Sequence, residues 1–238
     1  MKPCRLALAL LLPAFVCPAA GADAPAKPTP REALQAFNDL IGSWRGSGEP
    51  SGTREEKQKG FWQETIAWEW RFKGDDAWLA ATIEKGKHYT AAELRYLPDK
   101  AVYQLTVKTP AKESLTFTGS LKDKRLTLER TDEGTKEIQR LVFSLLHSNR
   151  YLYRYEVRPE DHKVFTQVFQ VGATKEGVPF VTEGDQPECV VSGGLGKIAV
   201  TYKGKTYYVC CSGCRDAFKD EPEKYIKEYE EKKAKKKD

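Results

Sequence analysis

The stretch FWQETIAWEWRFKGDDAWLAATIEK, residues 61–85, alternates apolar and polar side chains on both sides of a turn signal at Gly74. Alternation with a period of two, interrupted by turn residues, predicts a β-hairpin. Trp62, Trp68 and Trp70 have the same parity, so they share one face of the first strand. Aromatic side chains on such a face ordinarily fill a core, and the alternative is that they line a cavity.

The same pattern extends in both directions from this hairpin. Runs of β-branched and aromatic residues are separated by turn signals about every ten to twelve residues, which is the spacing of an all-β sandwich or barrel. Short links between successive strands favour an antiparallel up-and-down meander. Closure removes the exposed sheet edges, so we predict a mainly β fold with a barrel of about ten strands over residues 31–172. The predicted strands are 43–48, 61–71, 77–85, 88–97, 101–108, 114–120, 125–131, 137–146, 150–158 and 163–171.

A short helix is predicted directly before the first strand. Thr29 is a suitable N-cap, Pro30 suits the first helical position and Glu32 completes a capping box. Gly42 is expected to end the helix. The apolar residues of the helix fall on one face, which must be buried: Leu34, Phe37, Leu40 and Ile41.

The segment LIGSWRGSGE, residues 40–49, follows this helix and opens the meander. Its Gly42-Ser43-Trp44 matches the G-x-W motif of lipocalin-like, or calycin, barrels. The wider spacing L-x-G-x-W-x-G-x-G resembles the nitrobindin and fatty-acid-binding branch. The resemblance implies that Trp44 packs under the barrel floor and is covered by an arginine from a late strand, for which Arg154 is the candidate. It also implies a small-molecule cavity, without identifying the ligand.

A carrier of haem or of a small apolar ligand is the alternative function that this resemblance implies. Haem requires an axial ligand, and among the three histidines His88, His147 and His162 the last is best placed, at the start of the final predicted strand. A lone histidine carries no ligand spacing, so an ordinary surface or turn histidine is the more usual interpretation. In this alternative the cysteines near the C-terminus form disulfides that staple a small module.

Those cysteines surround a second predicted unit, over residues 185–232. Residues 198–209 alternate around Lys203-Gly204 and predict a hairpin. Ser212 is a suitable N-cap for a helix that follows, and this places Cys214 in its first turn, where N–H groups and the helix dipole stabilise a thiolate. A further helix begins near Pro222. The predicted unit is therefore a small hairpin-and-helix, treble-clef-like module around four thiols: Cys189, Cys210, Cys211 and Cys214.

A thiol cluster of this kind either holds a soft metal ion or forms disulfides. Metal–thiolate bonds explain how the module folds, because a unit of under about fifty residues buries little core. Pairing Cys189 with Cys210 or Cys211 would instead close a loop worth about 3 kcal/mol in the chain-entropy model. The helix-start position of Cys214 favours thiolates. Sulfur ligands suit Zn²⁺ or Cu(I) and exclude Mg²⁺ and Ca²⁺.

The module resembles YHS/TRASH-type metal-binding domains. The matching features are C-x-V-S-G at Cys189, the hairpin YKGKTYYVC, C-x3-C at Cys210 and Cys214, and the helical close AFKDEPEKYIKEY. The resemblance implies transition-metal binding with these three cysteines as ligands. Cys211 stands where many relatives have a non-ligand residue, and Ser192 where some have another cysteine. The coordination number is therefore open, and Cys211 is kept as a fourth candidate ligand.

The two ends of the chain predict export and a solvated tail. Residues 1–22 combine a basic start, an apolar run too short to span a bilayer and small residues before Asp23, as in a secretory signal peptide. Residues 23–30 form a Pro/Ala linker, and residues 233–238 a basic tail. We expect a secreted or periplasmic protein that does not span a membrane. The net charge of +5 is modest and interspersed, so no nucleic-acid partner is expected, and no protein partner is identified.

Catalysis has little support in the sequence. There is no G-x-S-x-G, P-loop, H-E-x-x-H or Gly-rich dinucleotide motif. An enzyme that uses Cys214 as a nucleophile is the weakest alternative. The sequence therefore predicts a non-enzymatic, exported protein whose cysteine thiolates hold Zn²⁺ or Cu(I) for trafficking, sensing or structural purposes.

Overall fold

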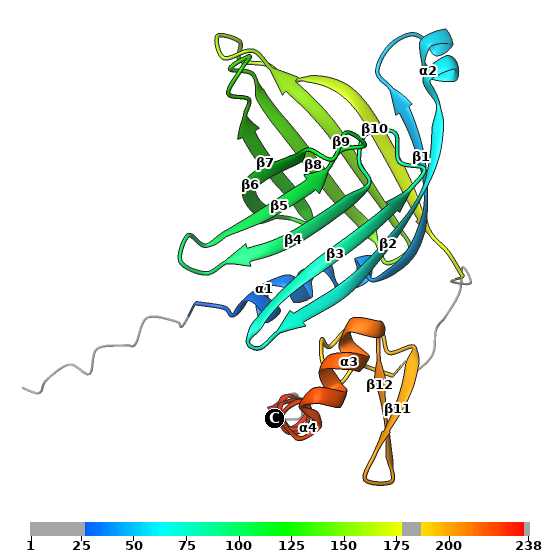
Figure 1. The fold of residues 1–238 in the computed structure, drawn as a ribbon, viewed down its shortest axis with the longest axis vertical. Helices are drawn as coiled ribbons and strands as arrows, with labels where there is room; N and C mark the ends of the chain where they lie inside the picture. The colour runs from blue at the N-terminus through cyan, green and yellow to red at the C-terminus, as the bar shows by residue number, and fades with distance from the viewer. Residues whose placement is uncertain (1–26, 178–186, 236–238) are drawn as a thin grey trace, which may run out of the picture.

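The computed structural model describes residues 27–177 and 187–235. The predicted signal peptide lies outside the described residues, as do residues 23–26 of the linker, residues 185–186 of the predicted module and residues 236–238 of the basic tail. In the described parts, a β-barrel stands above a small unit formed by the last 49 residues described, from 187 to 235. Figure 1 shows the small unit at one end of the barrel, where α3 (Ser212–Asp220) lies against β2 (Trp62–Lys73).

Within residues 27–177, ten antiparallel strands form the closed barrel in the order in which they occur in the chain. Gly46 of the first strand pairs with Glu64 on one side and with Ala173 of the last strand on the other, and this second pairing closes the barrel. The predicted up-and-down barrel is confirmed. Its strands are β1 (Gly42–Pro50), β2 (Trp62–Lys73), β3 (Asp76–Glu84), β4 (Ala91–Leu97), β5 (Val102–Lys108), β6 (Ser114–Lys122), β7 (Arg125–Thr131), β8 (Ile138–His147), β9 (Arg150–Arg158) and β10 (Thr166–Lys175).

The barrel interior is packed with side chains. Trp68 and Trp70 are buried and Trp62 is partly buried, in line with the predicted shared face of β2. The inward carboxylate of Glu64 accepts hydrogen bonds from the Tyr153 hydroxyl at 2.6 Å and from the Trp62 indole at 2.9 Å. Aromatic residues therefore serve as core, and the buried carboxylate of Glu64 among them has hydrogen-bond donors.

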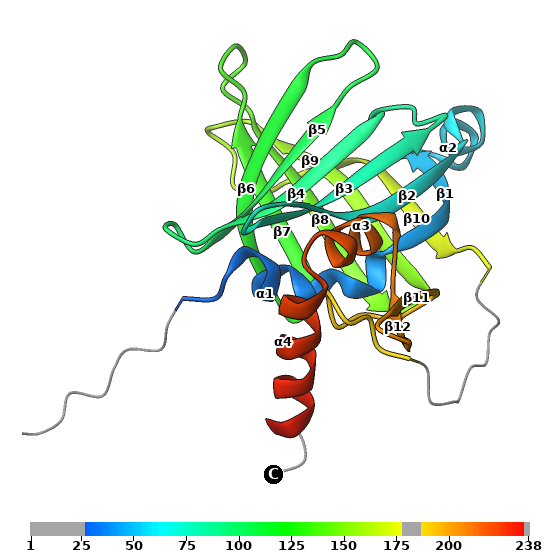
Figure 2. The same cartoon turned by 60° about the horizontal axis from the view of Figure 1, so that its bottom comes forward.

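The predicted N-terminal helix forms the floor of the barrel (Figure 2). It consists of α1 (Pro30–Leu34) followed by a 3₁₀ turn, η1 (Gln35–Leu40), and Thr29 and Glu32 make the predicted capping box. Its predicted apolar face is buried. Trp44 is 1% exposed and donates its indole N–H to the Leu40 carbonyl at 2.6 Å, which ties β1 to this floor.

The prediction for the residue that covers Trp44 was wrong. Arg154 does not cover Trp44: it has the opposite parity to the buried Tyr151 and Tyr153 on β9 and pairs with Glu156 instead. The cation over Trp44 is Lys175, at the end of β10, with its ammonium 5.0 Å from the ring centroid.

A helix absent from the sequence interpretation, α2 (Arg54–Gly60), follows β1. It buries no residue, so it has no apolar stripe to detect. The local signal was the capping box between Thr53 and Glu56, the same device that starts α1.

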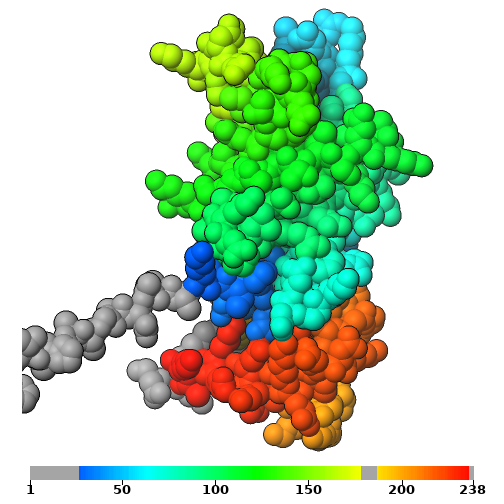
Figure 3. All heavy atoms as spheres, turned by 60° about the vertical axis from the view of Figure 1, so that its left-hand side comes forward, coloured from blue at the N-terminus to red at the C-terminus, as the bar shows by residue number. Residues whose placement is uncertain are grey.

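The C-terminal module contains a hairpin of β11 (Ile198–Tyr202) and β12 (Lys205–Val209), then α3 (Ser212–Asp220) and α4 (Pro222–Lys235). The hairpin has the predicted register, with Val200 opposite Tyr207 and Lys203-Gly204 at the turn. Figure 3 shows the module against the barrel floor, beside the N-terminal helix and the β2–β3 segment. Among the described residues, no helix combines the length and apolarity needed to span a bilayer.

Candidate metal centre

A tight loop carries Cys189 to the end of the hairpin. The loop closes through a bridge between Glu188 and Leu195, and its Cys189 N–H donates to the Gly194 carbonyl at 2.6 Å. A parallel bridge joins Cys189 to Tyr208 of β12. Because Tyr208 is two residues before Cys210, the loop delivers the first cysteine to the strand end that carries the others.

The remaining three cysteines mark the passage from β12 into α3. Cys211 is the N-cap of α3, with φ −155° and ψ 176°, and Cys214 lies in the first turn as predicted. Ser212 is not the N-cap that the sequence indicated, and its hydroxyl donates to the Glu69 carboxylate of β2 at 2.7 Å. Successive residues in extended backbone direct their side chains to different sides, so Cys210 and Cys211 leave the backbone in different directions, although their sulfurs lie 3.8 Å apart.

Three of the four predicted ligands converge. The sulfur atoms of Cys189, Cys210 and Cys214 all lie within 4.8 Å of one another, and the Cys210–Cys214 distance is 3.4 Å. Their residues are 0%, 8% and 0% exposed, respectively. Cys211 falls outside this group; it is more exposed, and its sulfur lies 3.8 Å from that of Cys210. The four described cysteines form no disulfide in the structure.

Ser192 completes the inner wall of the centre. It is fully buried, its N–H donates to the Cys189 sulfur at 3.4 Å, and its hydroxyl lies 3.4 Å from the Cys210 sulfur. Ser192 thus supplies polar contacts to two sulfurs, through its N–H and its hydroxyl, and its oxygen is not a soft-metal ligand.

Hydrogen bonding between the thiols separates their pKa values. Donation from the Cys210 and Cys214 thiols lowers the pKa of Cys189. The same two donors, with the N–H groups of Cys214 and Trp70, lower the pKa of Cys211. The pKa of Cys210 is raised because its thiol donates to Cys189 and Cys211, and burial raises that of Cys214. Cys189 and Cys211 therefore give up their protons more readily than Cys210 and Cys214.

The barrel wall contributes directly to the centre, through β2. The Trp70 backbone N–H donates to the Cys211 sulfur at 3.3 Å. Gly213 packs so closely against β2 that an added Cβ would lie 1.6 Å from the Trp70 carbonyl oxygen. The Trp70 indole donates to Asn38 at 3.1 Å, and Asn38 in turn donates to the Ser192 carbonyl at 3.0 Å. Sequence analysis missed Trp70 and Asn38 as parts of the site, since no local pattern links them to cysteines so distant in the chain.

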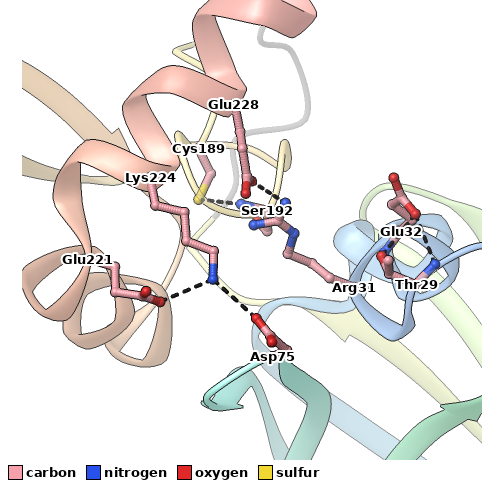
Figure 4. A network of polar contacts seen from close by, with 9 residues as sticks. All are labelled: Thr29, Arg31, Glu32, Asp75, Cys189, Ser192, Glu221, Lys224 and Glu228. Carbon is pink, nitrogen blue, oxygen red and sulfur yellow. Dashed lines mark hydrogen bonds and ion pairs between the residues drawn. The ribbon is translucent and has the colours of Figure 1, made fainter.

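Ion pairs on α4 fix the far side of the module to the barrel, as Figure 4 shows. Glu228 pairs with Arg31 of α1. The Lys224 ammonium lies 3.3 Å from Asp75 in the β2–β3 turn and 3.2 Å from Glu221 of its own module. These two ion pairs add to the contacts that α3 and the Cys189 loop make with the barrel and its floor.

The donor set fits a soft metal ion. The converging group consists of thiol sulfurs alone, without a carboxylate or an imidazole. Such donors suit Cu(I) and Zn²⁺, whereas Mg²⁺ and Ca²⁺ require oxygen ligands. Cys189, Cys210 and Cys214 are the residues that would hold the ion, and their burial keeps water away from it.

Comparison with protein families matches residues 197–229 to the YHS domain. The match covers the hairpin, Cys210, Cys211, Cys214 and most of both helices, which confirms the predicted YHS resemblance over these residues. Cys189 precedes the matched segment. No curated protein matches the chain.

Among solved structures, one described as "Structure of EF1p2_mFAP2b bound to DFHBI" shares 12% sequence identity with this chain. The match covers 60% of this chain and 98% of that one, with a TM-score of 0.23. A score this low gives no basis for inferring function.

Proposed function

We propose that this chain is a transition-metal-binding protein in which Cys189, Cys210 and Cys214 hold one soft ion as thiolates. The observation that carries the proposal is the convergence of their three sulfurs within 4.8 Å in a buried site. The YHS match over residues 197–229 supports the same chemistry. The role is binding, for trafficking, sensing or structure, and not catalysis.

Cu(I) is the preferred ion. Zn²⁺ in structural sites almost always takes four ligands, whereas Cu(I) is satisfied by fewer soft donors and is selected by thiolates. The converging group offers three sulfurs, with Cys211 outside it. Zn²⁺ remains the competing occupant, with Cys211 or water as its fourth ligand.

Export is proposed on the sequence of residues 1–22. In an oxidising compartment, a bound ion protects the three thiolates from conversion to disulfides. Because the inward aromatic residues of the barrel are assigned to its core, no barrel ligand is part of this proposal. His162, the candidate for haem, has a 64% exposed side chain beside Asp161 in the β9–β10 turn, which gives haem binding no support.

A relationship between the barrel and the calycins is proposed on its architecture alone. Trp44 lies buried at the floor, as that resemblance implies, and Lys175 takes the position expected of an arginine. The barrel then serves as the rigid wall that supports the metal centre, through Trp70 and Asn38.

The test is metal uptake by the full chain, purified anaerobically under reducing conditions. Titration with Cu(I) or Zn²⁺ against a competing chelator is expected to give one ion per chain, with Cu(I) bound more tightly. Replacing Cys189, Cys210 or Cys214 with Ser should weaken binding by more than about 100-fold, since changes outside the ligand shell already cost about 10- to 100-fold. Ser212→Ala, which removes a hydroxyl beside the cluster, is the matched control and should bind normally.

Two outcomes would contradict the proposal. One is the absence of uptake of either ion by the reduced protein. The other is the recovery of these cysteines as disulfides from freshly isolated protein, which would favour the stapled module instead.

A further inference from the structure

Cys211 differs from the three converging cysteines in exposure and in direction. It is the only one of the four described cysteines that is not buried. Its extended backbone directs the side chain away from that of Cys210 and toward β2. Its sulfur nevertheless stays 3.8 Å from that of Cys210.

The same two thiols face both Cys189 and Cys211. The sulfurs of Cys210 and Cys214 lie within 4.8 Å of the Cys189 sulfur on the inner side. On the outer side, the Cys210 sulfur lies 3.8 Å from that of Cys211, which Cys214 also contacts. The four sulfurs thus form two triangles that share the Cys210–Cys214 edge. The inner triangle is buried, and the outer one reaches the surface through Cys211.

The barrel holds Cys211 in its outer position. The Trp70 N–H donates to its sulfur at 3.3 Å, and Gly213 lies against the Trp70 carbonyl, so α3 cannot shift freely along β2. The Trp70 N–H would lose its acceptor if the Cys211 sulfur moved away from β2, so this hydrogen bond favours the outer position of Cys211.

We propose that Cys211 is an exchange ligand, which passes a soft ion between a thiol-bearing carrier and the inner three-sulfur site. This inference rests on the proposed function. Cys211 forms a metal–sulfur bond as the carrier's thiolate leaves, while Cys210 and Cys214 join the ion. Cys189 then replaces Cys211, which returns to the Trp70 N–H. Protons of the remaining thiols pass to water or to the departing thiolate, and the ion keeps its oxidation state throughout.

The first test measures the rate and the equilibrium of transfer separately, in the full chain. Cu(I)–glutathione is mixed with wild type or with Cys211→Ser, and loading is followed by stopped flow. The variant should load on the order of tenfold more slowly, because the accessible attacking sulfur is gone. The affinity of the variant for Cu(I) at equilibrium should stay within about threefold of wild type, because the loss of Cys211 changes the rates of loading and release. Ser212→Ala, adjacent in sequence and without a sulfur, should load at the wild-type rate.

The second test needs no variant. Loaded wild-type protein is treated with iodoacetamide, and each cysteine is mapped by mass spectrometry. Cys211 should be alkylated first, with the ion retained, while Cys189, Cys210 and Cys214 are protected.

The outcomes separate this inference from the proposed function. An unchanged loading rate in Cys211→Ser, or an affinity loss as large as that of Cys189→Ser, overturns the exchange role, and so does equal protection of all four cysteines. Each of these results leaves metal binding by the chain intact. Absence of uptake by wild type instead overturns the proposed function itself.

Discussion

The barrel and the C-terminal module are stabilised in different ways. The largest fully buried side chains, including Trp44, Trp70 and Tyr151, belong to the barrel and its floor. In the module, three of the buried residues are cysteines, and its buried apolar residues are few and mostly small: Val190, Val191, Val209, Ala217, Phe218 and Tyr225. The fraction of apolar surface that a domain buries increases with its number of residues, so the barrel can be stabilised by its own core. The smaller module depends for its stability on its cysteine sulfurs and on contacts with the barrel.

Removal of the metal should give the largest effect and should affect only one of the two regions. Structural Zn²⁺ sites in small domains contribute an apparent binding free energy of about 10–16 kcal/mol. We expect chelation under reducing conditions to accelerate amide exchange in β12 and α3 by at least about 100-fold, while exchange in β5 to β9 stays unchanged. Hydrogen exchange read by mass spectrometry measures both regions in one sample. Equal acceleration in both would show that they are one cooperative unit.

Trp44→Ala should show the opposite selectivity. Loss of this buried floor residue should lower the free energy of unfolding by about 3–5 kcal/mol, measured by urea denaturation with circular dichroism. Metal stoichiometry should remain that of wild type. The matched control is Trp78→Ala. Trp78 lies on the outer face of the barrel, and the guanidinium carbon of Arg95 is 4.1 Å from its ring centroid. Its replacement should lower the free energy of unfolding by about 1 kcal/mol. Similar losses in both variants would argue against a floor role for Trp44.

Gly213→Ala tests the seam where the two regions meet. The new Cβ would clash with the Trp70 carbonyl, so we expect a loss of about 1–3 kcal/mol together with faster alkylation of Cys211 in the ion-free protein. Gly134→Ala, whose Cβ would meet nothing closer than Asp132 at 3.4 Å, should change stability by less than about 0.5 kcal/mol. Normal stability and normal alkylation in Gly213→Ala would mean that the close approach has no energetic role.

The smallest effect concerns pH and Lys175, whose ammonium lies over Trp44 and donates to the Asp39 carbonyl at 2.6 Å. Burial, with the nearby charge of Lys197, lowers its pKa from 10.5 to about 8, against opposing attraction from Asp39 and Cys210. Between about pH 8 and 10.5 the folded chain has lost this proton and the unfolded chain retains it. Raising the pH through that window therefore favours the folded state.

Across this window, the free energy of unfolding of wild type should rise by about 1–2 kcal/mol relative to that of Lys175→Met. The rise is smaller than the full pKa shift would give, because the ammonium is partly solvated and its desolvation penalty is reduced. The measurement is the free energy of unfolding of both proteins at each pH. Parallel pH profiles for the two proteins would contradict the lowered pKa.

The sequence predicted the barrel well because its evidence is local. Alternation fixes which side chains are buried, and turn residues fix where strands end, so all ten strands were placed close to their observed bounds. The missed helix α2 has no apolar stripe, and only its capping box marks it. Ser212 has the local signature of an N-cap, but Glu69 of β2 takes its hydroxyl, and this competition is invisible in the local sequence.

The metal centre was predictable in composition but not in arrangement. Spacing brought four cysteines to one module, and the helix start placed Cys214 correctly. The separation of Cys211 from the other three depends on the backbone at the N-cap and on the Trp70 N–H. Asn38, which links the Trp70 indole to the Cys189 loop, lies more than 150 residues from Ser192. Contacts of that range have no signature in a single sequence.

One consequence of the Trp70 contact concerns transplantation. A hairpin-and-helix unit cut from this chain and grafted onto another scaffold would keep all four sulfurs but lose the amide that holds Cys211 outward. Such a graft would be free to close a four-sulfur cage, which suits Zn²⁺ rather than Cu(I). The surface of the host protein beneath the grafted module would thus help to determine whether the module binds Zn²⁺ or Cu(I).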